Sequence, residues 1–204
     1  MKRALTCVMI LTLMLSLTAP ADAGKFNKKL SVGDAAPPWA MLAGTDGKPH
    51  ALTDYPAGLL VIVFTCNRCP IAQSYEERLA KFAATFKEQG VSLVAINVNG
   101  GKAESLASMK SRAEEKKYAF DYLKDAGQES AKAYGARTTP TVFLLDRDRK
   151  VIYMGAFDDN WQAEAAVEHH YLTDAVAAAL AGKMIDVAET RSAGCGIPFG
   201  VEEE

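Results

Sequence analysis

The chain has 204 residues, of which 49% are hydrophobic and 24% are charged, and its formal net charge is −2. This length and hydrophobic content suffice for one globular domain with a sizeable core. Because the charge is close to neutral, the composition gives no indication of binding to nucleic acid or to an anionic membrane surface.

Residues 1–23 have the pattern of a secretory signal peptide. A basic start, Lys2-Arg3, precedes the uncharged residues 4–19 and the small-residue cleavage site Ala21-Asp22-Ala23. The apolar run is short for a membrane span, which needs about 20 residues. We therefore expect cleavage before Gly24 and a periplasmic or secreted mature chain, attached to a membrane only if the segment is retained.

Cleavage would leave three of the four cysteines, namely Cys66, Cys69 and Cys195. Disulfides persist outside the cytosol, so an odd number of cysteines leaves one thiol without an obvious partner. The role of the third thiol, Cys195, is therefore a question that the sequence raises.

The first part of the mature chain reads as an extended lead-in. Residues 30–39 contain two adjacent prolines, which exclude a helix. An Asp46-Gly47 turn follows, which predicts two short strands on either side.

The next stretch carries the chemistry. Residues 59–64 are all apolar and rich in β-branched side chains, which predicts a strand buried on both faces. Cys66 and Cys69 follow at C-x-x-C spacing, and residues 71–82 have the composition and period of a helix. This order is typical of a redox motif, whereas a four-cysteine zinc site would need a second such pair, which the sequence lacks. We expect no metal and no cofactor; a structural disulfide is the alternative for the pair.

The placement of the two cysteines predicts different roles for them. Helix starts offer free N–H groups and partial positive charge, which stabilise a thiolate, the reactive form of cysteine. Cys66 is expected at the strand-to-helix junction with an exposed sulfur, and Cys69 one turn into the helix with a less accessible one. We therefore predict that Cys66 attacks a disulfide and that Cys69 resolves the intermediate by forming a Cys66–Cys69 disulfide.

The rest of the chain alternates between strand and helix patterns. Pro140 directly precedes a strand pattern. This position suits proline, because proline has no N–H group to donate to a neighbouring strand. In chain order we expect a strand over 91–98, a helix over 104–117, a short edge strand over 120–123, a helix over 128–134, a hairpin of strands over 141–146 and 151–155, a helix over about 163–181, and an irregular stretch over 182–204.

This order of elements, with Cys66-x-x-Cys69 and Thr139-Pro140-Thr141, resembles the thioredoxin fold. The lead-in Val32-Gly33-Asp34-Ala35-Ala36-Pro37 is similar to that of its redoxin and peroxiredoxin-like (AhpC/TSA-like) branch, and Gly194-Cys195-Gly196-Ile197 resembles a tail of such bacterial proteins. The resemblance implies an α/β fold: a central mixed sheet flanked by helices, with an N-terminal redoxin-type extension. It divides the chain into a signal peptide (1–23), a thioredoxin-like domain (24–182) and a tail (183–204).

The resemblance also implies a substrate site. It makes the Thr139–Pro140 bond cis and places it beside Cys66, so that Thr139 contacts the substrate and Pro140 shapes the groove. A cis proline exposes the backbone of the preceding residue, which can then pair with an extended peptide.

Three functions are compatible with these patterns. The first is an exported thiol-disulfide oxidoreductase that acts on a disulfide-containing protein or a small thiol and exchanges electrons with an unidentified donor or acceptor. The second is a peroxiredoxin-like peroxidase with antioxidant activity, in which Cys195 would be a third redox thiol that resolves the oxidised cysteine. The third is copper binding and delivery through Cys69-Pro70 and one of the adjacent histidines His169 and His170, which point about 100° apart on a helix.

Overall fold

The computed structural model describes residues 24–200. The expected signal peptide and residues 201–204 lie outside the described residues. Within residues 24–200, none of the helices is both long and apolar enough to cross a membrane.

Seven strands form one mixed sheet in the order β2-β1-β5-β4-β3-β7-β8, and β6 and β9 form a separate pair. β3 lies inside the sheet, parallel to β4 and antiparallel to β7. The strands are β1 (Leu42–Gly44), β2 (Pro49–His50), β3 (Leu59–Thr65), β4 (Val91–Asn97), β5 (Asp121–Lys124), β6 (Thr138–Thr139), β7 (Thr141–Leu145), β8 (Val151–Gly155) and β9 (Cys195–Gly196).

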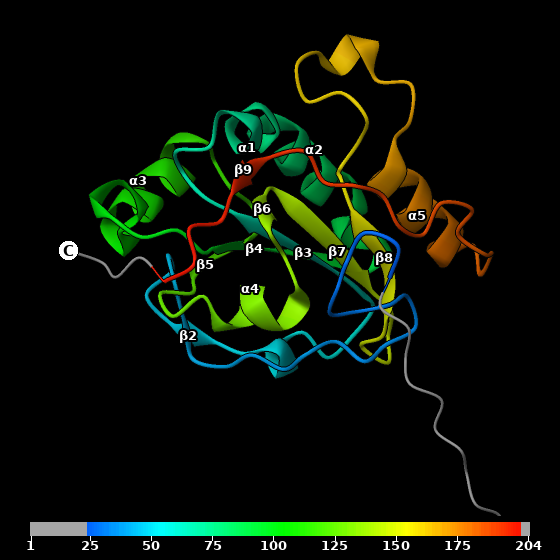
Figure 1. Ribbon diagram of the computed structural model, residues 1–204, viewed down its shortest axis with the longest axis horizontal. Coiled ribbons are helices and arrows are strands. Elements are labelled where there is room, and N and C mark those ends of the chain that lie inside the picture. Colours follow the sequence, from blue (N-terminus) through cyan, green and yellow to red (C-terminus); the bar gives the residue numbers. More distant parts are fainter. Residues whose placement is uncertain (1–23, 201–204) are drawn as a thin grey trace, which may run out of the picture.

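Helices cover both faces of this sheet (Figure 1). They are α1 (Pro70–Ser74), α2 (Glu76–Phe86), α3 (Leu106–Glu115), α4 (Glu129–Tyr134) and α5 (Tyr171–Leu180). Because side chains alternate along a strand, Leu60, Ile62 and Phe64 of β3 pack on the side of α4, whereas Val61 and Val63 pack on the side of α2 and α5. The structure confirms the predicted thioredoxin-like α/β fold, with a mixed sheet between helices.

The N-terminal extension joins this sheet. β1 and β2 form the hairpin predicted around Asp46-Gly47, and β1 pairs antiparallel with β5. The expectation of an edge strand near residues 120–123 is therefore wrong. β5 is an interior strand, because it pairs with β4 on one edge and with β1 of the N-terminal extension on the other.

The expected helix over residues 163–181 is shorter in the structure. It begins at Tyr171, and the preceding residues form only a single 3₁₀ turn, Glu164–Ala166, with exposed side chains. Leu172, Ala175 and Val176 form the buried face of α5. The alanine-rich stretch before it has no comparable apolar face, and packing of such a face supplies most of a helix's stability in a protein.

The C-terminal stretch was expected to be irregular, and most of it is. However, β9 pairs antiparallel with β6, with Cys195 opposite Thr139 and Gly196 opposite Thr138. In Figure 1 the red C-terminal strand accordingly lies beside β6 and close to α1. The tail is thus brought to the end of β3 where the two cysteines lie.

Candidate active site

Cys69 occupies the N-cap of α1, and Pro70 is the first residue of that helix. Proline is favoured at this position because its missing N–H would have no partner there. The Cys69 sulfur accepts a hydrogen bond from the Ala72 N–H at 3.4 Å. The expectation that Cys69 lies one turn inside the helix is therefore wrong, since the helix begins only after it.

The side chains of Cys66 and Cys69, the two cysteines of the C-x-x-C motif, are both buried. Cys66 is 3% exposed and Cys69 is 2% exposed, and the half-buried Cys195 packs against them. The expected exposure of Cys66 is thus not found. Its sulfur lies against the Thr139 hydroxyl at 3.3 Å, and the pairing of β9 with β6 adds Cys195 to the same cluster.

Three sulfur atoms form one cluster. The Cys69 sulfur lies 2.7 Å from the Cys195 sulfur and 3.0 Å from the Thr139 carbonyl oxygen. The Cys66 sulfur lies 3.3 Å from the Thr139 hydroxyl. All three cysteines are free thiols in the structure, so the predicted Cys66–Cys69 disulfide stays a prediction.

The three thiols differ in acidity. Hydrogen bonding from Cys66, then from Cys195 and from the Ala72 N–H, lowers the pKa of Cys69 against the opposing effect of burial. The neighbouring Cys69 sulfur and burial raise the pKa of Cys66 and also that of Cys195. The Ala72 N–H at the helix start therefore favours a negative charge on Cys69, while the Thr139 carbonyl oxygen, to which the Cys69 thiol donates, opposes it.

The Thr139–Pro140 bond is cis, as the resemblance implied. Thr139 is fully buried and touches both cysteines of the motif, one through its hydroxyl and the other through its carbonyl group. The loop that carries the cis proline thus lies directly against the redox pair, in the position expected of a substrate-contacting segment.

A buried acid beneath the motif was missed by the sequence analysis. Glu104 is 2% exposed, and its carboxylate accepts hydrogen bonds from the backbone N–H groups of Asn67 and Arg68 at 2.7 and 3.0 Å. It also accepts one from the Asn97 side chain at 2.7 Å. Glu104 therefore fixes the backbone between the two cysteines.

A signal for this contact does exist in the sequence. β3 and β4 were predicted as neighbouring buried strands, and parallel strands end at the same edge of a sheet. Glu104 follows β4 closely, after the Gly100-Gly101 break, just as the cysteines follow β3. An acidic residue there could have been assigned to the same edge rather than to the start of a helix.

Replacing Glu104 with glutamine is expected to lower the free energy of unfolding by about 1–3 kcal/mol. An amide can keep the hydrogen bonds on one side, but its NH₂ group then faces the N–H of Arg68 without an acceptor. Chemical denaturation measures the effect. Glu114→Gln, an exposed site in α3, is the matched control and should change stability by less than about 0.5 kcal/mol. Equal effects of the two substitutions would contradict a structural role for Glu104.

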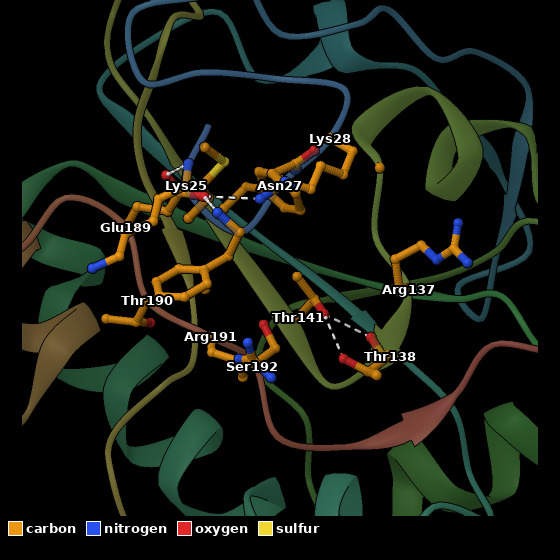
Figure 2. A pocket seen from close by; sticks show the side chains of 15 residues that line it. Lys25, Asn27, Lys28, Arg137, Thr138, Thr141, Glu189, Thr190, Arg191 and Ser192 are labelled. Carbon is orange, nitrogen blue, oxygen red and sulfur yellow. Dashed lines mark hydrogen bonds between the residues drawn. The ribbon is translucent and has the colours of Figure 1, made fainter. Parts of the chain in front are cut away.

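Two cavities flank the cis proline. One, of about 270 Å³, is lined by Pro140 and by the aromatic side chains of Tyr75, Phe157, Trp161 and Tyr171. The other, of about 370 Å³, reaches Thr138 and Thr141, and its border includes four basic side chains, those of Lys25, Lys28, Arg137 and Arg191. Figure 2 shows Thr138 and Ser192 on one side of this second cavity, facing Lys25, Asn27 and Lys28 on the other.

Comparisons with known proteins identify the family of this chain. Residues 32–154, more than half of the chain, match the model of the AhpC/TSA family. The chain belongs to the AhpC/TSA family. The matched range includes Cys66, Cys69, Thr139 and Pro140 but ends well before Cys195.

Individual relatives of this AhpC/TSA protein include redox enzymes. It is 28% identical to the thiol-disulfide oxidoreductase ResA of Geobacillus thermodenitrificans over 146 residues, which cover 71% of this chain and 81% of that protein. Among solved structures, a hypothetical protein from Sinorhizobium meliloti matches with 36% identity and a TM-score of 0.78, over 86% of this chain and 98% of its own. A candidate thiol:disulfide interchange protein DsbE from Chlorobium tepidum matches with 26% identity and a TM-score of 0.60, over 74% and 99% of the two chains.

The histidines considered for copper delivery lie elsewhere. His169 and His170 are exposed, and they precede α5 rather than lying in it as expected. Among the described residues, donor side chains converge at Asp159, Glu168 and His169, all exposed, and no cysteine takes part. No observation on the described residues therefore favours the copper hypothesis.

Proposed function

We propose that this AhpC/TSA protein is an exported thiol-disulfide oxidoreductase whose redox pair is Cys66 and Cys69. One observation carries the proposal. The two cysteines lie side by side against Thr139, the residue before the cis proline, and Cys69 caps the helix that follows. This arrangement places a stabilised thiolate next to a second thiol, which is what disulfide exchange requires.

The relatives support the same reaction class. ResA and the candidate DsbE are named for thiol-disulfide exchange, and the chain spans most of the length of each. Export remains part of the proposal, and it rests on the signal-peptide pattern of residues 1–23. Protein recovered from the periplasm or medium should begin at Gly24, and an intact Met1 there would contradict cleavage.

The order of attack is the second part of the proposal. The sequence predicted that Cys66 attacks first, whereas the lowered pKa of Cys69 and its place at the N-cap favour Cys69 as the attacking thiolate. Single-cysteine trapping decides between them. Both variants also carry Cys195→Ser, because the Cys195 sulfur lies beside Cys69 and would resolve an adduct there. With a disulfide substrate, Cys66→Ser/Cys195→Ser should accumulate a mixed disulfide on Cys69, whereas the opposite order would yield a stable adduct on Cys66 in the Cys69→Ser/Cys195→Ser protein.

We propose an extended peptide disulfide as the substrate. β6 pairs with β9 in this structure, and it would offer the same backbone groups to an extended peptide once that segment leaves. The aromatic cavity beside Pro140 could take an apolar side chain, and the basic cavity beside Thr138 an acidic one. The electron donor or acceptor that restores the pair is a second, unidentified partner.

The reduction potential of the Cys66–Cys69 pair tests the redox role. Catalytic pairs lie between about −270 and −120 mV, while structural disulfides lie below about −300 mV. We expect a value inside the catalytic range, measured by alkylation and mass after equilibration in thiol buffers. A value below about −300 mV would make the bond structural and would refute the proposed function.

Peroxide reduction is the second candidate, because the contact between Cys69 and Cys195 offers a resolving thiol. Attack of the Cys69 thiolate on a hydroperoxide would release an alcohol and leave a sulfenic acid. Cys195 would then displace water and form a Cys69–Cys195 disulfide. Peroxide consumption with a dithiol reductant tests this candidate, and oxidation that yields only Cys66–Cys69 would count against it.

A further inference from the structure

The C-terminal segment 193–197, called here the docked tail, is held by main-chain contacts. β9 pairs with both residues of β6, and the Ile197 N–H donates to the Arg137 carbonyl at 2.9 Å. Ile197 is itself buried in the main core at 7% exposure. The tail therefore adds a strand to β6 and is anchored beyond that strand by an apolar side chain.

The approach of the two backbones is close at Gly194. A Cβ atom there would lie 2.2 Å from the Thr139 carbonyl oxygen and 2.7 Å from its carbon, a distance that side chains do not tolerate. At Gly196 a Cβ atom would meet nothing within 4 Å. Contact with the segment before the cis proline thus depends on a glycine at position 194 and not at position 196.

The docked tail brings a sulfur to the redox pair from a strand position. Cys195 is opposite Thr139 in the β6–β9 pair, and its sulfur lies 2.7 Å from that of Cys69. An extended peptide with a cysteine in the same register would present its sulfur to Cys69 in the same way. Strand addition to β6 sets which peptide residue lies opposite Thr139. The sulfur of a cysteine at that position would then lie next to the Cys69 thiol.

We propose that the docked tail is an internal counterpart of a cysteine-containing peptide substrate and that Cys195 is a third redox thiol that exchanges with Cys69. This inference rests on the proposed function, since it assigns a partner to the same dithiol. It also requires that the tail leave β6 before a peptide can occupy that edge.

The exchange conserves atoms and electrons. The Cys69 thiolate attacks a substrate disulfide, which forms a Cys69–substrate mixed disulfide and releases the first substrate thiolate. When the tail redocks, the Cys195 thiolate attacks the Cys69 sulfur and releases the second substrate thiolate, and both released groups take up protons. Two electrons have then moved from Cys69 and Cys195 to the substrate. Attack by Cys66 on Cys69 converts the product into the Cys66–Cys69 disulfide and frees Cys195 without further electron transfer.

The test uses the mature chain with Cys66→Ser, in which Cys69 and Cys195 are the two remaining cysteines. The protein is equilibrated in a buffer of reduced and oxidised glutathione, quenched with acid, alkylated and mapped by mass spectrometry. We expect the internal Cys69–Cys195 disulfide to exceed the glutathione adducts, because docking gives Cys195 a high effective concentration at Cys69. Glutathione adducts on Cys69 with Cys195 left as a thiol would overturn the inference.

A matched glycine pair tests docking in the same background. Gly194→Ala should shift the equilibrium from the internal disulfide to glutathione adducts by roughly tenfold, the scale of a forced overpacked contact. Gly196→Ala should leave the equilibrium within about twofold, because its Cβ meets open space. Equal behaviour of the two variants would show that strand docking does not deliver Cys195 and would overturn the inference.

Two further measurements keep the outcomes distinct. If Gly194→Ala fails to fold, a different experiment on the unsubstituted protein is used. The protein receives one equivalent of oxidised glutathione, is quenched rapidly, and its disulfides are mapped at each time. A transient Cys69–Cys195 disulfide supports the inference, and its absence at all times overturns it. The Cys66–Cys69 potential, measured in a Cys195→Ser protein, tests the proposed function alone, so the failure of one claim is separable from the failure of the other.

Discussion

Cys69→Ser is expected to abolish disulfide reduction, with a loss of at least about 1000-fold in turnover. Cys69 is the sulfur beside Cys195 and the Thr139 carbonyl, and its pKa is the one lowered in the cluster. A hydroxyl at this position cannot form a disulfide with either neighbouring thiol. Reduction of a protein disulfide by the purified variant, with a dithiol as electron source, measures the effect.

The other two cysteines provide the contrast. Cys66→Ser keeps Cys69 and Cys195, so any turnover that remains measures what Cys195 contributes as a second thiol. The double variant Cys66→Ser/Cys195→Ser has a single thiol and should stall as a mixed disulfide on Cys69. Unchanged turnover by Cys69→Ser would refute the assigned role, provided that its thermal unfolding matches that of the parent.

Arg78→Met is expected to lower the free energy of unfolding by about 3–5 kcal/mol. The Arg78 guanidinium donates to the Asp158 carboxylate at 2.7 Å, and the two side chains are only 7% and 2% exposed. The same guanidinium donates to the Asn160 carbonyl at 2.6 Å, which ties α2 to the loop after β8. Removal of the cation would leave a buried carboxylate with only neutral partners.

Lys81→Met on the same helix is the matched control. Its ion pair with Glu164, at 3.2 Å, is exposed on both sides and should be worth less than about 1 kcal/mol. Urea unfolding of the two variants measures the difference. If Arg78→Met cost no more than Lys81→Met, the buried pair would not be what fixes the loop that lines the aromatic cavity beside Pro140.

The redox motif itself was largely predictable. The apolar run of β3 fixes a buried strand by composition alone, and the Cys-x-x-Cys spacing with a helical pattern after it predicts the junction. The first helix differs in detail, since it begins at Pro70 and breaks at Tyr75. The position of the N-cap matters, because it places Cys69 rather than Cys66 at the start of the helix, although both side chains are buried.

Other parts of the site depend on contacts that leave little trace in local sequence. The pairing of β9 with β6 involves only two residues on each side, too few for any strand pattern to predict. The sequence pattern placed Glu104 at the start of a charged helix. Its burial results instead from β3 and β4 ending at the same edge of the sheet. Both features arise from neighbours that are distant in the chain.

The cis form of the Thr139–Pro140 bond was implied only by the family resemblance. The sequence by itself determined the redox motif and the α/β order of elements. Each of these rests on residues that are adjacent or regularly spaced, so local conformational preference and hydrophobic period suffice to encode them. Only the tertiary structure decided which thiol caps the helix and what lies against it. Cys69 and Cys195 are 126 positions apart, and the strand pairing that joins them exists only once the sheet, the cis-proline loop and the core that holds Ile197 are assembled.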